Sequence, residues 1–156
     1  MVSKTRVPDG EPGFAEALVR LETAHGELLG LCDRLEGIAD SLPDAIDRKS
    51  CEEAAGILMP MVARTHRFEE ETLFPMISRA YPGENMTRTL ERLRNEHVED
   101  ECYAEDLTEA LEKLAGHKPG AIEAETFGYM LRGFFAAMRR HIAFEQTHLP
   151  PLSQAG

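Results

Sequence analysis

The chain has 156 residues and carries 17 Lys and Arg against 28 Asp and Glu, so its formal net charge is −11. This length is typical of one domain. A hydrophobic share of 42% is ordinary for a globular protein and too high for a disordered one. The acid excess argues against nucleic acid or an anionic membrane as a partner, because both repel a negative surface.

Cysteine usage and the start of the chain limit the class further. Cys32, Cys51 and Cys102 form no CxxC pair, which argues against a disulfide scaffold and a thiolate zinc site. No apolar run approaches the roughly 20 residues that cross a bilayer. The first residues, MVSKTRVPDGEPG, are polar and lack the apolar core of a signal peptide. We therefore expect a soluble, cytoplasmic protein.

Proline and glycine divide the chain into an N-terminal arm, residues 1–13, and one domain, residues 14–152. Within the domain, apolar residues recur at steps of three and four, the pattern of one face of an α-helix. Four helices are predicted, over about residues 14–42, 50–80, 84–115 and 121–149. Pro60 lies inside the second, so we expect a kink there or a later start. Short connections favour antiparallel neighbours, and the predicted fold is all-α, an antiparallel up-down-up-down four-helix bundle.

Each predicted helix carries one histidine near its middle, on the apolar face. These residues are His25, His66, His97 and His141. Three of them are followed four residues later by a carboxylate, at Glu70, Glu101 and Glu145. Residues at i and i+4 share one helix face, so each pair points at the same place. A lone histidine on an apolar face is usually a hydrogen-bonded core residue. One histidine per helix, at matching depth, instead favours a joint site.

A buried cluster of this kind predicts a metal centre. An unpaired buried carboxylate costs several kcal/mol or takes up a proton, and a bound cation removes that cost. Four His and three Glu exceed the four ligands of one tetrahedral zinc. They fit two six-coordinate first-row metals, and mixed imidazole and carboxylate donors suit iron or manganese. A zinc ion that acts only as a structural brace is the plain alternative.

The constellation resembles the hemerythrin-like family, also called the HHE cation-binding family, from about Phe14 to Leu152. That family has a His on the first helix, His-x3-Glu on the second, a His on the third, and a His followed by a carboxylate on the fourth. The matching positions here are His25, His66 with Glu70, His97, and His141 with Glu145. The resemblance implies a four-helix bundle that holds two iron ions in a non-haem di-iron centre, with manganese or zinc as other possible metals. It implies binding of dioxygen or a related small molecule.

Two positions depart from the oxygen-carrying hemerythrins that the chain resembles. Those carriers place a second His four residues after the third-helix His, where this chain has Glu101. They place Asp five residues after the fourth-helix His, where this chain has Glu145 at four. We expect the added carboxylate to stabilise the ferric state. This favours oxygen reduction, peroxide or nitric oxide chemistry, or redox sensing over reversible carriage. Three roles are open for Glu101: coordinating the metal, hydrogen bonding to a ligating His, or pointing into water.

The predicted function is therefore binding or reduction of a small ligand, such as dioxygen, peroxide or nitric oxide, at a di-iron site. The alternative is an iron-dependent sensor or iron-handling protein that acts through a partner without catalysis. The sequence does not choose between carrier, enzyme and sensor, and it does not indicate an oligomeric state. Two further histidines are expected outside the metal site: His148, near a helix end, and His117, in a Gly/Pro turn.

Overall fold

The computed structural model describes residues 13–149, and every regular element in that range is a helix. The elements are α1 (Phe14–Asp40), α2 (Arg48–Phe68), the π-helix η1 (Glu69–Leu73), α3 (Phe74–Ala80), α4 (Glu84–Ala115) and α5 (Ala124–His148). Because α2, η1 and α3 follow one another without a break, the chain forms four long rods. The predicted all-α fold is confirmed. Most of the predicted arm, residues 1–12, and the predicted domain end at 150–152 lie outside the described residues.

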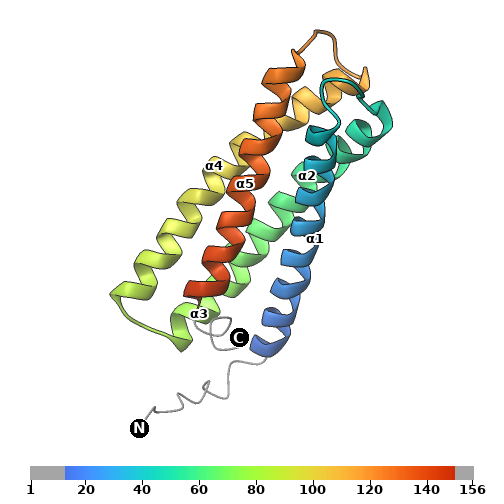
Figure 1. Ribbon diagram of the computed structural model, residues 1–156. Helices are drawn as coiled ribbons and strands as arrows, with labels where there is room; N and C mark the ends of the chain where they lie inside the picture. The colour runs from blue at the N-terminus through green and yellow to red at the C-terminus, as the bar shows by residue number, and fades with distance from the viewer. Residues whose placement is uncertain (1–12, 150–156) are drawn as a thin grey trace.

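The four rods lie side by side in an elongated bundle (Figure 1). The α1–α2 and α4–α5 connections are at one end, and the α3–α4 turn is at the other end with the start of α1 and the end of α5. Helix α4 packs against both α2 and α5, and α1 packs against the same two helices. This arrangement is compatible with the predicted antiparallel order. No helix within residues 13–149 has the length and apolar character needed to span a membrane.

The helix ends have local causes. Asp47 caps α2, because its Oδ1 accepts hydrogen bonds from the backbone N–H groups of Lys49 and Ser50, which are donors without a partner inside the helix. Gly116 ends α4 with a left-handed φ of 84°, a conformation that glycine adopts without steric cost. Pro60 lies inside α2. The later start considered for this helix does not occur.

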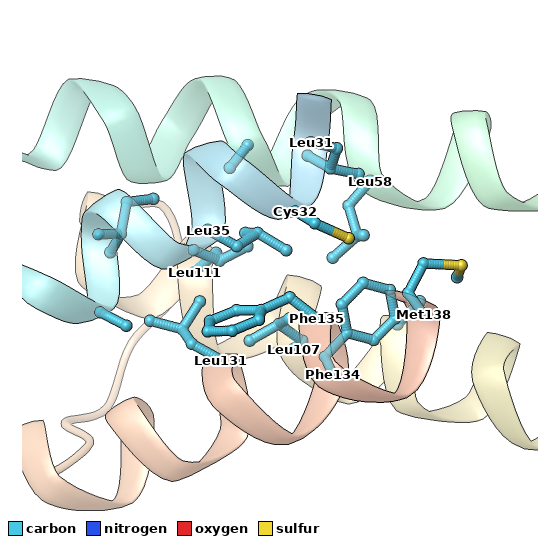
Figure 2. Packing of buried hydrophobic residues seen from close by; sticks show 14 of the residues in the cluster. Leu31, Cys32, Leu35, Leu58, Leu107, Leu111, Leu131, Phe134, Phe135 and Met138 are labelled. Carbon is cyan, nitrogen blue, oxygen red and sulfur yellow. The ribbon is translucent and has the colours of Figure 1, made fainter. Parts of the chain in front are cut away.

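The apolar core is divided into two clusters by a polar layer. The larger cluster lies in the half of the bundle near the α1–α2 and α4–α5 connections. In Figure 2, Phe134 and Phe135 of α5 lie in this cluster among leucines of α1, α2 and α4. The smaller cluster fills the other end. Along α1, for example, Leu21 belongs to the smaller cluster and Leu28 to the larger one, with His25 between them. Apolar burial thus encloses a polar layer on both sides.

Candidate metal centre

The polar layer receives one histidine from each rod. All four are buried, with 6% of the surface of His141 exposed and less for the others. The rings of His66 and His97 stack with their centroids 3.8 Å apart, and the centroids of His97 and His141 are 5.2 Å apart. His25 joins them through a shared carboxylate. The structure therefore brings the four predicted histidines into one layer.

Glu145 is the carboxylate that links two of these histidines, and its side chain is completely buried. Its Oε2 lies 2.6 Å from Nε2 of His25, and its Oε1 lies 3.0 Å from Nε2 of His141. The first distance is short, as expected when the acceptor is ionised, and the second is an ordinary hydrogen-bond length. One side chain of α5 thus connects α1 to the polar layer.

The second buried carboxylate is Glu69 rather than the predicted Glu70. Glu69 is 1% exposed, and its Oε2 lies 2.9 Å from Nε2 of His97. The side chain of Glu70 is 38% exposed, and its Oε2 lies 3.6 Å from Nδ1 of the same ring. Both residues are in η1, the π-helical segment. Single π-turns inside α-helices occur frequently at functional sites. Glu69 is at i+3 from His66, a spacing that shares a helix face as i+4 does, and this was the signal available in the sequence.

Several polar atoms of the layer have no hydrogen-bond partner. Nε2 of His66, Nε2 of His97 and Oε2 of Glu69 are buried and unpaired. The last two are close to each other but are not aligned for a hydrogen bond. One donor atom from each of four buried residues lies within 4.8 Å of the others, and these residues are Glu69, His97, His141 and Glu145. An unsatisfied buried polar group costs about 1–3 kcal/mol. A cation would remove that cost, so these residues fit a metal ion.

A comparison with protein-family models gives the same result. The model described as the hemerythrin HHE cation-binding domain matches residues 17–152. The chain belongs to this family. Comparisons with curated proteins and with solved structures found no match. The predicted family is confirmed, and the family description together with the buried His/Glu cluster indicates cation binding.

The HHE domain also has carboxylates on the outer side of its histidines. Nδ1 of His66 lies 3.2 Å from Oε1 of Glu101, and Nδ1 of His141 lies 2.9 Å from Oε2 of Glu96. The side chain of Glu101 is 39% exposed. Of the three roles open for Glu101, the structure contains the hydrogen bond to a histidine. Glu96 was not singled out in the sequence, because its partner is on another helix.

The remaining histidines of the HHE domain are outside the layer. His148 is exposed, and its ring lies 4.2 Å from the ring of Phe144. His117 is exposed and lies 3.1 Å from an oxygen of Glu52. Cys102 is also exposed, and it forms no disulfide. None of these three side chains belongs to the buried cluster.

Burial and neighbouring charges set the protonation of the metal-free layer. Burial, together with the charge of His141, lowers the pKa of His66 to about 4. Burial and the negative Glu145 raise the pKa of Glu69 well above its ordinary value. Burial of His141 opposes its charged form, but the hydrogen bonds to Glu145 and Glu96 raise its pKa to about 9. Burial likewise opposes ionisation of Glu145, and the hydrogen bonds from His141 and His25 nevertheless lower its pKa. His141 is therefore protonated at neutral pH, and ionisation of Glu69 is disfavoured.

Metal uptake should therefore release protons. A divalent ion needs a deprotonated carboxylate and a neutral imidazole. We expect the metal-free domain at pH 7 to release protons on loading, from His141 and, because burial disfavours its ionised form, from Glu69. The measurement is a titration in weak buffer with a pH indicator. Glu69→Gln should release fewer protons than the wild type. Equal release by the two proteins would contradict the assignment of a proton to Glu69.

Proposed function

We propose that this protein is a non-haem di-iron protein. It binds or reduces a small ligand, such as dioxygen, peroxide or nitric oxide, in the core of an antiparallel up-down four-helix bundle. One observation carries the proposal: buried nitrogen and oxygen atoms of His66, His97 and Glu69 have no hydrogen-bond partner and lie in a single layer. Membership of the HHE cation-binding family supports it.

The proposed ligands are six buried histidines and glutamates of the layer, His25, His66, Glu69, His97, His141 and Glu145. Glu69, His97, His141 and Glu145 each have one donor atom within 4.8 Å of the others. Six donors exceed the need of one tetrahedral zinc, and mixed imidazole and carboxylate donors suit iron or manganese. Bundle cores are a known setting for paired metals. Glu70 and Glu101, which the sequence also predicted as ligands, have partly exposed side chains on the outer side of the rings.

The chain's own residues prepare the layer in three ways. The two apolar clusters exclude water on both sides, so charges in the layer interact strongly. Glu69 and Glu145 supply negative charge that favours the higher oxidation state of a bound cation. The hydrogen bonds to Glu145 fix two imidazoles from different helices. When bound, iron supplies the one-electron redox chemistry that these side chains lack.

Metal analysis of the purified protein tests this proposal. We expect about two irons per chain, the number that six buried donors accommodate, and charge-transfer absorption that dithionite bleaches. Elemental analysis and spectra before and after reduction measure both. His97→Ala removes a buried donor and should lose iron. His117→Ala, at an exposed site, should keep it.

The competing results are distinct. One zinc per chain, or no metal, with a featureless spectrum would contradict the di-iron proposal and favour a structural or partner-binding role. If iron is present, titration of the reduced protein with dioxygen, peroxide and nitric oxide then identifies the ligand by its spectral change.

A further inference from the structure

Two glutamates of α4 contact the outer side of two histidines of the polar layer. The two histidines belong to different helices. Glu101 lies 3.2 Å from Nδ1 of His66, which belongs to α2. Glu96 lies 2.9 Å from Nδ1 of His141, which belongs to α5. Between the two glutamates in the sequence, His97 of α4 is turned into the layer. Helix α4 thus supplies one inner side chain and two outer acceptors.

These contacts divide the two nitrogens of each ring between different tasks. A carboxylate only accepts a hydrogen bond, so each ring donates from Nδ1. The lone pair of the neutral ring is then at Nε2. On His66 this Nε2 is buried and without a partner. In the metal-free protein His141 is protonated at both nitrogens, and its Nε2 donates to Glu145. A metal ion would take the place of that Nε2 proton. In both rings Nδ1 contacts the outer glutamate and Nε2 faces the core.

We propose that Glu101 and Glu96 are positioning residues. They hold His66 and His141 in the ring orientation and tautomer that present Nε2 to a metal ion in the polar layer. This inference rests on the proposed function, since it assigns a role toward the metal that those imidazoles bind. Partners of this kind fix the ring and make the imidazole a stronger donor, and their loss typically costs 10–100-fold in metal affinity.

The two glutamates are partly exposed, although the imidazoles that they contact are buried. The side chain of Glu96 is 30% exposed and that of Glu101 is 39% exposed. Each carboxylate keeps part of its hydration and still reaches a ring in the core. A second acidic side chain, Asp100, lies 3.8 Å from Nδ1 of His141. That distance is too long for a hydrogen bond, but Asp100 is close enough to replace Glu96 after a small movement.

The test is a chelator-competition titration of metal-free protein with Co²⁺, whose visible spectrum reports ligand geometry. The variants are Glu101→Ala, Glu101→Gln, Glu96→Gln, and Glu96→Ala combined with Asp100→Asn to remove the substitute acceptor. Glu91→Gln is the matched control, because Glu91 is exposed on the same helix and the change removes the same charge. We expect each alanine variant to weaken one of two binding steps by about 10–100-fold and to change the Co²⁺ spectrum. Glutamine, which keeps an acceptor oxygen, should lose less than alanine.

The outcomes separate this inference from the proposed function. Wild-type protein that binds no Co²⁺ would overturn both. Wild-type protein that binds two ions, with alanine variants within twofold of Glu91→Gln, would overturn the positioning role alone. The helical content of every variant is first compared with that of the wild type by circular dichroism. If an alanine variant has lost helix, the Co²⁺ affinity of the glutamine variant at the same position is compared with that of Glu91→Gln instead, and a value within twofold overturns the positioning role.

Discussion

Glu145→Gln is expected to destabilise the metal-free protein by about 3–5 kcal/mol, the usual effect of removing one partner from a buried ion pair. Glu145 accepts hydrogen bonds from Nε2 of both His25 and His141 inside the core. The neutral amide leaves a buried imidazolium without its counter-charge. Urea unfolding of the metal-free variant and wild type measures the difference. Glu125→Gln, at an exposed site on the same helix, should unfold as the wild type does.

The pH dependence of this difference has a definite sign. The pKa of Glu145 is lowered in the folded state, so its contribution is present above the ordinary value of 4.5 and is lost as the pH falls further. The pKa of His141 is raised from 6.5 to about 9, so its contribution is complete below 6.5 and is lost as the pH rises through 9. The difference between wild type and Glu145→Gln should therefore be largest between pH 4.5 and 6.5. A variant as stable as the wild type in that range would show that the His25–Glu145–His141 link contributes nothing.

Glu69→Gln should lower metal affinity by about 100-fold or more, because a direct carboxylate ligand contributes more than the 10–100-fold of an outer partner. Glu70→Gln, the neighbouring change in the same π-helix, should lower it by about tenfold or less. Glu69 is buried beside Nε2 of His97, whereas Glu70 is partly exposed on the outer side of that ring. Competition with a chelator measures both affinities.

The same pair of variants makes an opposite prediction for the metal-free protein. Burial raises the pKa of Glu69, so its ionisation opposes folding as the pH rises above 4.5. Glu69→Gln should therefore unfold at the same or higher urea concentration at neutral pH, although it binds metal more weakly. If Glu70→Gln loses more affinity than Glu69→Gln, the ligand is the glutamate of the His-x3-Glu motif. The helix would then change register when metal binds.

Local patterns were sufficient for the rods and for the histidines. Glycine and proline fix where a helix ends, and apolar spacing fixes which face is buried, so each histidine on that face was placed in the core. The predicted helices over residues 14–42 and 84–115 correspond to α1, Phe14–Asp40, and α4, Glu84–Ala115. The His/Glu spacing also sufficed to identify the HHE family, which the family match confirms.

The partners of these histidines were decided by tertiary structure. Glu145 meets His25 from another helix, and Glu101 meets His66 rather than His97, its neighbour in the sequence pattern. Such pairs depend on how far each rod is rotated and shifted against the next. Packing of the two apolar clusters sets this rotation and shift, and the sequence of a single helix does not encode it. The burial of Glu69 rather than of the predicted ligand Glu70 has a related reason. The 3.6-residue repeat assumes a regular α-helix, whereas the turn at Glu69–Leu73 is a π-helix. The sequence by itself therefore determined which helices contribute a histidine to the polar layer, and only the tertiary structure decided which carboxylates are buried beside those histidines.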